Sequence, residues 1–259
     1  MSHLAIYLFG GFRVELNGQP LNCFGTDKNR ALLAYLALES GRPHRREALA
    51  NLLWCEHAEA VARNSLRQAL YQLRHILPQS EYQPHLLITA KDVQFNPASD
   101  HWLDVLEFNH RITSCQLHHP QQDGLCVDCL DSLQRAIELY KGDLLDGFTL
   151  RNCTQFTEWH VINQENCHYQ ALVALSTLAD YYEANKKYNQ LMNCTQRKIE
   201  LEPWRESAYR RQMWALAMLG QRERALLRYK TLEEILQREM GIHPTSSTRR
   251  LYRKIRDTK

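Results

Sequence analysis

Hydrophobic and polar residues in the first hundred positions follow two different periods. Residues 4–16 and 86–96 alternate apolar with polar or small side chains, which predicts short strands, the first two meeting at Gly10-Gly11. Between these stretches, apolar residues recur every three or four positions, which predicts helices. The predicted helices cover residues 27–40, 44–54 and 58–77. The pattern therefore predicts a small antiparallel sheet, three helices and a closing hairpin.

The third predicted helix, residues 58–77, carries different chemistry on its two sides. Its apolar side consists of Leu66, Ala69, Leu70, Leu73 and Leu77. Its other faces carry arginine, asparagine, glutamine and tyrosine, and no acidic residue follows Glu59 in this stretch. Such a surface suits an acidic groove that offers hydrogen-bond partners, as the major groove of DNA does. A solvated amphipathic helix without a ligand is the plainer alternative.

The second half of the chain shows only helical spacing from Phe156 onward. The predicted helices cover residues 154–184, 188–201, 206–219, 221–240 and 245–256. A period of 34 residues relates Tyr182, Lys186 and Leu191 to Leu216, Gly220 and Ala225. Repeats of this length are typical of tetratricopeptide-like helix pairs, which stack on one another and leave a concave surface for partners.

The order of these elements predicts a two-domain architecture. Three helices, the third polar and basic on its outer side, followed by a hairpin, form the layout of a winged helix-turn-helix. Residues 102–115 and 129–141 also have helical spacing and lead into the helical half. The predicted fold class is therefore mainly α with small β. An N-terminal winged helix-turn-helix domain, residues 1–100, precedes an all-α tetratricopeptide-like domain, residues 101–259.

Composition agrees with a soluble globular protein. Of the 259 residues, 44% are hydrophobic and 24% are charged. No run of 18 apolar residues occurs, and the N-terminus lacks the features of a secretory signal, so we expect a cytoplasmic protein without a membrane span. The net charge of +3 is a weak indication of nucleic-acid binding. The excess of arginine between residues 42 and 75 is a stronger one.

Three of the eight cysteines are clustered with histidine in a loop at residues 115–129. Cys115-x2-His118 precedes Cys126-x2-Cys129, so two short clamps of soft or borderline ligands flank the loop. This spacing predicts a structural zinc ion bound by Cys115, His118, Cys126 and Cys129, with His119 as a substitute for His118. A surface loop with free thiols is the alternative.

Three sequence blocks in the first domain carry a family resemblance. LFGGFRVELNGQPL, KNRALLAYLALESGRPHRREALANLLW and ARNSLRQALYQLRHIL resemble the OmpR-type DNA-binding domain of the Streptomyces antibiotic regulatory protein family. The wing segment KDVQF departs from the family, because it lacks the glycine-tyrosine pair common in that hairpin.

The second half carries the matching resemblance. AIELYKGDLLDGF and the segments from FTEWHVINQENCHYQ onward resemble the bacterial transcriptional activator domain, which follows the winged helix in the same family. The Cys/His loop at residues 115–129 departs from the shorter antibiotic regulators, which generally lack it.

The resemblance implies a sequence-specific transcriptional activator that binds promoter repeats and recruits RNA polymerase. Double-stranded DNA and RNA polymerase are the expected partners, with a homodimer on DNA as one expected state. Residues of the third helix expected to contact groove and phosphates are Arg67, Gln68, Tyr71 and Arg74. Residues expected to contact phosphates are Lys28, Arg45, Arg46 and Arg63, with Lys91 in the wing.

Two alternatives and one exclusion accompany this interpretation. The chain could be a protein-interaction scaffold whose winged helix no longer binds DNA, or the front part of a larger regulator linked to an ATPase. An enzyme is not expected, because the sequence contains no G-x-x-x-x-G-K-[ST], H-E-x-x-H or G-x-S-x-G motif.

Overall fold

The computed structural model describes residues 3–77, 83–118 and 125–257, without the side chain of His118. The chain divides into two compact units. Unit 1 comprises residues 1–113 and 135–169, and unit 2 comprises residues 114–134 and 170–259. The fold is mainly helical with a small β content, as the sequence predicts, and its strands form two small sheets.

The first sheet of unit 1 brings the N-terminus beside a strand that lies about a hundred residues later. Its strands are β1 (Leu4–Tyr7), β2 (Arg13–Leu16), β3 (Gln19–Pro20) and β7 (His101–Leu103), in the order β3-β2-β1-β7. β1 and β7 are parallel, and the other neighbours are antiparallel. Asn17 and Gly18 form the tight turn between β2 and β3 with φ angles of 50° and 77°.

Strand β7 corrects one sequence prediction. The helix predicted from Trp102 begins only at Asp104, because Leu4, Ala5 and Ile6 pair with His101, Trp102 and Leu103. The apolar spacing of this segment fits a helix, but pairing with β1 satisfies its backbone groups in the extended form.

Three helices follow the first sheet, as predicted. They are α1 (Asp27–Leu38), α2 (Arg46–Trp54) and α3 (Glu59–Ile76). The Thr26 hydroxyl accepts a hydrogen bond from the backbone N–H of Asn29 at 3.3 Å, so Thr26 caps the N-terminus of α1.

The second sheet of unit 1 contains the predicted hairpin and one further strand. Its strands are β4 (His44–Arg45), β6 (Asp92–Phe95) and β5 (Leu86–Ile88), all antiparallel. The helix predicted from His44 therefore starts two residues later, because His44 and Arg45 pair with the hairpin instead. This pairing holds the wing against the N-terminus of α2.

The segment around residues 140–147 packs onto the end of β1 within unit 1. The Leu145 N–H donates to the Leu8 carbonyl at 2.7 Å, and the Gly10 N–H donates to the Asp143 carbonyl at 3.0 Å. A Cβ atom on Gly142 would lie 3.1 Å from the Gly10 Cα, so a larger residue there would require the two segments to shift apart slightly. The rings of Phe9, Phe108 and Tyr140 form an edge-to-face cluster beside it.

The helices that follow β7 continue through both units of the chain. They are α4 (Asp104–His118), α5 (Val127–Leu139) and α6 (Thr154–Ala184). The buried Asp104 carboxylate accepts hydrogen bonds from the backbone N–H groups of Leu8, Phe9 and Val105 at 2.8–3.0 Å. It therefore joins the end of β1 to the first turn of α4.

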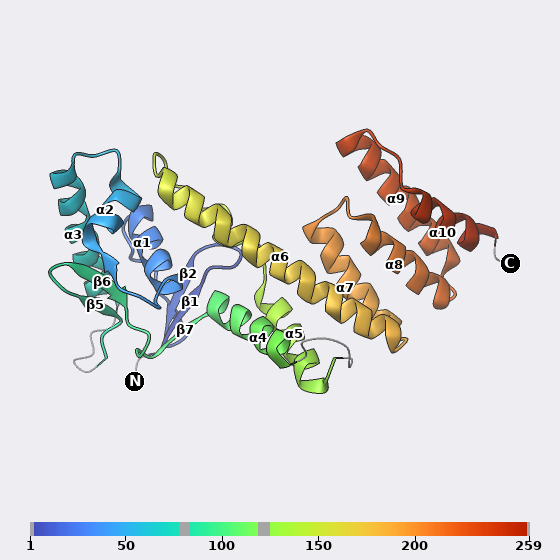
Figure 1. Ribbon diagram of the computed structural model, residues 1–259, viewed down its shortest axis with the longest axis horizontal. Coiled ribbons are helices and arrows are strands. Elements are labelled where there is room, and N and C mark those ends of the chain that lie inside the picture. Colours follow the sequence, from blue (N-terminus) through green and yellow to red (C-terminus); the bar gives the residue numbers. More distant parts are fainter. Residues whose placement is uncertain (1–2, 78–82, 119–124, 258–259) are drawn as a thin grey trace. The chain divides into compact units, whose positions relative to one another are not determined.

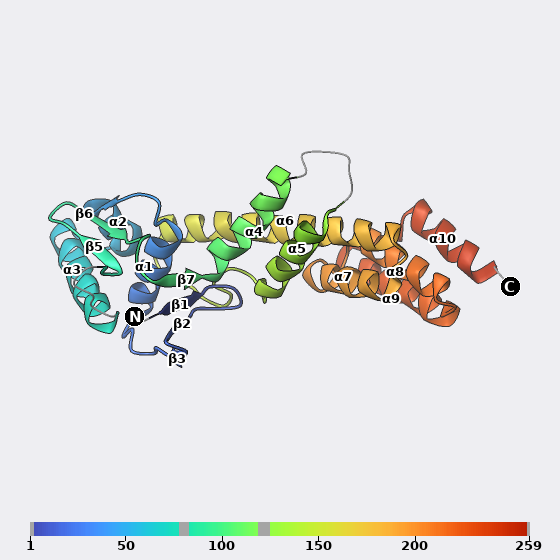
Figure 2. The ribbon, with the colours of Figure 1, turned by 90° about the horizontal axis from the view of Figure 1, so that it is seen from below.

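Helix pairs with the predicted 34-residue period make up most of unit 2 (Figures 1 and 2). The helices are α7 (Tyr188–Leu201), α8 (Glu206–Met218), α9 (Arg222–Met240) and α10 (Ser246–Asp257). The Lys187 N–H donates to the Tyr182 carbonyl at 2.8 Å, and 34 positions later the Gln221 N–H donates to the Leu216 carbonyl at 2.8 Å. Lys186 and Gly220 adopt left-handed φ angles of 56° and 72° at the corresponding turns.

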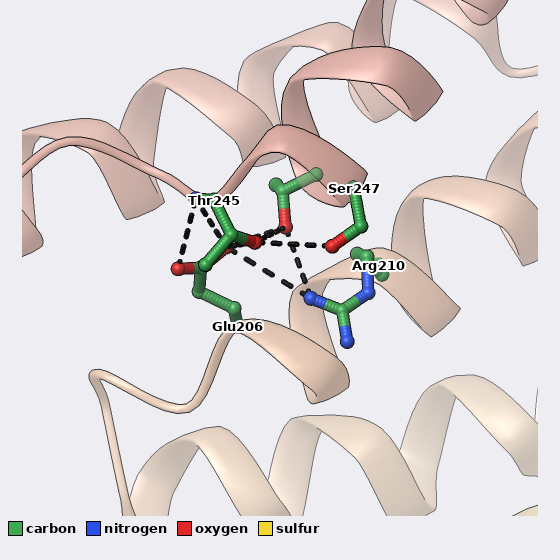
Figure 3. Close-up of polar contacts among 5 residues, drawn as sticks. Glu206, Arg210, Thr245 and Ser247 are labelled. Carbon is green, nitrogen blue, oxygen red and sulfur yellow. Dashed lines mark hydrogen bonds and ion pairs between the residues drawn. The ribbon is translucent and has the colours of Figure 1, made fainter.

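A polar network fixes the N-terminus of the last helix to α8 (Figure 3). The Glu206 carboxylate accepts the backbone N–H of Thr245 at 3.0 Å and its hydroxyl at 2.7 Å, and the Thr248 hydroxyl donates to it at 2.5 Å. A carboxylate at a helix N-terminus is stabilised by the free N–H groups there. Glu206 therefore serves as a cap supplied by a neighbouring helix.

No helix in the described ranges is long and apolar enough to cross a lipid bilayer.

Asp104 yields a prediction on pH. Burial raises the pKa of its carboxyl group from 3.8 to about 6, while hydrogen bonds from backbone N–H groups oppose the rise. Because the folded protein holds this proton more tightly, Asp104 favours folding below about pH 4, and that contribution is lost as the pH rises to about 6. We expect the difference in unfolding free energy, wild type minus Asp104→Asn, to decrease as the pH is raised from about 4 to about 6. Urea denaturation measures it, and a constant or growing difference contradicts the prediction.

Candidate nucleic-acid interface

Helix α3 separates its apolar and polar residues as the sequence predicts. Its apolar positions are buried, namely Ala62, Leu66, Ala69, Leu70 and Leu73. Its polar side chains are exposed on the remaining faces, namely Arg63, Asn64, Arg67, Gln68, Tyr71, Gln72, Arg74 and His75. The buried stripe fixes the rotation of the helix, so the basic and amide side chains point to solvent together.

A hollow of about 880 Å³, here called the basic hollow, lies between α3, the start of α2 and the β5–β6 turn. Its charged lining residues are Arg45, Arg46, Arg63, Arg67 and Lys91, with Glu47 as the one carboxylate among the described lining residues. Three separate segments therefore contribute cations to one concave surface. Clefts lined by charges of one sign concentrate the field and attract ligands of the opposite sign.

A second hollow, of about 570 Å³, follows α3 toward its C-terminal end. Its lining residues are Arg46, Arg67, Leu70, Tyr71, Arg74, His75 and Ile88. The Tyr71 side chain is 64% exposed, and its ring lies 4.1 Å from that of His75. Arg46 and Arg67 line both hollows, so the two form adjoining parts of one basic surface.

Acidic neighbours partly balance two of the cations. Arg63 forms ion pairs with Glu59 and, at 3.7 Å, with Glu47, and Arg45 lies 3.4 Å from Asp92. Ion pairs between exposed side chains contribute only about 0–1 kcal/mol. These ion pairs therefore orient the arginine side chains but are weak enough for phosphate oxygens to replace the carboxylates.

The two arginines shared by both hollows bond to neutral oxygens. Arg46 Nη1 donates to the Thr89 carbonyl at 3.3 Å, and Arg67 Nη2 donates to Asn64 Oδ1 at 2.7 Å. Because these acceptors carry no charge, the positive charge of each arginine remains available to an anion. The Arg46 contact also ties the N-terminus of α2 to the wing.

Two of the predicted contact residues line neither hollow. Lys28 Nζ lies 2.5 Å from Glu56 Oε1 and 5.6 Å from the ring centre of Trp54, on the side of α1 near the end of α2. Gln68 is exposed on α3 beside Arg67. The structure thus brings together seven of the nine predicted residues: Arg45, Arg46, Arg63, Arg67, Tyr71, Arg74 and Lys91.

Asn64 and His75 line the two hollows of the basic surface but are not among the residues predicted to contact DNA. Asn64 lies one helical turn before Arg67, and His75 lies one turn after Tyr71. Extending the predicted face by one turn in each direction would have identified both.

A buried amide helps to position α3. Asn29 is 3% exposed, and its Nδ2 atom donates to the Phe24 carbonyl at 2.7 Å and to Gln72 Oε1. Gly25, in the left-handed region with φ of 73°, lies beside this contact. The loop before α1 is therefore linked by hydrogen bonds to the polar side of α3.

The predicted zinc ligands are described only in part. Cys115 and Cys129 are buried and Cys126 is half-buried, whereas the side chain of His118 lies outside the described residues, as does His119. Among the side chains that the structure describes, no three histidine, cysteine or acidic residues are already arranged to hold a metal ion. Zinc binding by these residues therefore stays a prediction.

Comparison with known families covers both halves of the chain. Residues 103–256, more than half of the chain, match the bacterial transcriptional activator domain. The chain belongs to this family. Residues 20–94 match the C-terminal domain of transcriptional regulatory proteins, which contains the hollows described above. The two domains together are those of the Streptomyces antibiotic regulatory proteins, as the sequence resemblance predicts.

Three relatives are named as regulatory proteins, and two of them, EmbR and MoaR1, as transcriptional regulatory proteins. EmbR of Mycobacterium tuberculosis is 26% identical over 258 residues, which cover 96% of this chain and 62% of EmbR. MoaR1 of the same species is 21% identical, with 96% and 78% covered. AfsR of Streptomyces coelicolor is 23% identical, with 96% and 24% covered. The chain thus spans less than two thirds of the length of EmbR.

A solved structure shares the fold of this family member. EmbR of Mycobacterium tuberculosis, solved in complex with a low-affinity phosphopeptide, has a TM-score of 0.68 and 21% sequence identity. The match covers 98% of this chain and 65% of that chain. It confirms a winged-helix domain followed by a helical domain.

Truncating a side chain should lower the free energy of unfolding much more on the buried side of α3 than on its exposed side. Leu70 is 3% exposed, so Leu70→Ala leaves a cavity that should lower the free energy of unfolding by roughly 2–5 kcal/mol. Gln68→Ala, on the exposed side, serves as the control and should change it by less than about 0.5 kcal/mol. Urea denaturation followed by circular dichroism measures both. Equal effects of the two substitutions would contradict the rotation of α3 described here.

Proposed function

We propose that this family member is a sequence-specific transcriptional activator that inserts α3 into the major groove of promoter DNA. The observation that carries the proposal is the basic surface formed by α2, α3 and the wing, with Arg46 and Arg67 at its centre. A helix of this width fits the major groove, and the flanking cations meet the phosphates on either side. Membership of a family of transcriptional regulators supports the same conclusion.

Position on the surface divides the proposed contacts into two groups. Residues that project from the exposed side of α3 are placed to reach base edges, namely Arg67, Gln68, Tyr71 and Arg74. Residues at the start of α2, at the start of α3 and in the wing are placed to meet phosphates, namely Arg45, Arg46, Arg63 and Lys91. Lys28 is a peripheral phosphate contact and would first have to leave Glu56.

Activation itself requires a second partner, which we propose to be RNA polymerase. The activator domain supplies stacked helix pairs, an architecture that ordinarily presents surfaces to other proteins. Two copies bound to promoter repeats would place two such domains beside the polymerase. Footprinting on promoter DNA reports the number of bound copies, and transcription with purified polymerase reports activation.

Arginine substitutions on α3 test the DNA-binding proposal. We expect Arg67→Ala and Arg74→Ala each to weaken binding to promoter DNA by roughly 1–3 kcal/mol where the side chain reads a base. The combined variant should lose most sequence-specific binding, as measured by fluorescence anisotropy on promoter DNA and on a scrambled duplex. Affinity of wild type should also fall steeply with salt, because phosphate contacts release counterions.

A charge-matched control distinguishes a groove contact from a general loss of positive charge. Arg249→Ala/Arg250→Ala removes the same charge from exposed positions of α10, outside the winged helix, and should leave DNA affinity nearly unchanged. Unaltered binding by Arg67→Ala/Arg74→Ala would show that α3 does not read DNA. Absence of DNA binding by wild type would favour the interaction-scaffold alternative.

A further inference from the structure

Three cysteines of unit 2 converge where α4 ends and α5 begins. Cys115 lies in the last turns of α4, Cys126 immediately precedes α5, and Cys129 lies in its first turn. The Cys115 thiol donates to the Cys129 carbonyl at 3.6 Å, and the Cys129 N–H donates to the Cys126 sulfur at 3.4 Å. The Cys129 thiol also interacts with the thiols of both other cysteines.

From this convergence we propose that Cys115, Cys126 and Cys129 form a thiolate site for a soft or borderline divalent cation, zinc in the ordinary case. Each thiol releases its proton to solvent when its sulfur bonds to the ion. The site would clamp the end of α4 to the start of α5, across the segment that separates them. This role is structural and independent of the DNA surface proposed above.

The surroundings of the sulfurs favour a bound ion. A backbone N–H that donates to a cysteine sulfur stabilises negative charge there, as the Cys129 N–H does for Cys126. Cys115 and Cys129 are buried, so water competes little with the protein ligands. A disulfide would use two of the three sulfurs and leave the third unpaired, whereas a metal ion uses all three.

The Cys115 thiol now donates to a backbone carbonyl, so ion binding requires this side chain to turn. Rotation about χ1 moves a cysteine sulfur between staggered positions without moving the backbone. The described residues supply three ligands. The proposal does not depend on which group fills the fourth position.

Cobalt binding by the full chain tests this site. Reduced, metal-free protein titrated with Co²⁺ should develop the sulfur-to-cobalt charge-transfer and visible bands of a tetrahedral thiolate site. The titration should saturate at one ion per chain, and Zn²⁺ should abolish the bands. Cys126→Ser/Cys129→Ser should lose the bands. Cys23→Ser and Cys55→Ser, at exposed cysteines, serve as controls and should keep them.

Two results would overturn the proposal. One is the absence of thiolate–cobalt bands in reduced wild type, a measurement that does not depend on any variant folding. The other is retention of the bands in Cys126→Ser/Cys129→Ser, which would place the ion elsewhere. Circular dichroism establishes that each variant is folded before its spectrum is compared with that of wild type.

Discussion

The burial of one side of α3 is the constraint on which the rest of this protein depends. Leu66, Leu70 and Leu73 are each 3% exposed or less, so the helix cannot rotate about its axis without exposing them. That fixed rotation determines which arginines face outward. Without it, the charges of α3 would be an ordinary solvated surface, whereas with it they form one side of a basic hollow.

The winged helix of this chain is built together with part of the activator domain. Unit 1 contains residues 135–169 as well as the winged helix, and the segment around Leu145 bonds to the end of β1. Within the same unit, Trp159 Nε1 donates to Glu39 Oε1 at 2.9 Å, and the Cys153 thiol donates to the Leu53 carbonyl at 3.3 Å. The first segments of the activator domain therefore support α1 and α2, on which α3 rests.

Local sequence signals predict the helices well and the shortest strands poorly. The bounds predicted for α6 and α7 coincide with those observed, and the 34-residue period reappears as equivalent turns at Lys186 and Gly220. By contrast, β4 and β7 have two and three residues, and the spacing predicts helix for both residues of β4 and for the last two of β7. A strand this short has too few residues to show alternation, and its existence depends on a partner distant in the sequence.

The sequence by itself determined the class of fold, the amphipathic helix at the centre of the proposed interface and most of its outward residues. Hydrophobic period and residue chemistry are local properties, which a single chain displays directly. Only the tertiary structure decided that Arg45, Arg67 and Lys91 line one hollow while Lys28 pairs with Glu56 outside it. Those relations join residues on different elements, and the packing of α3 and the pairing of β4 with β6 bring them together.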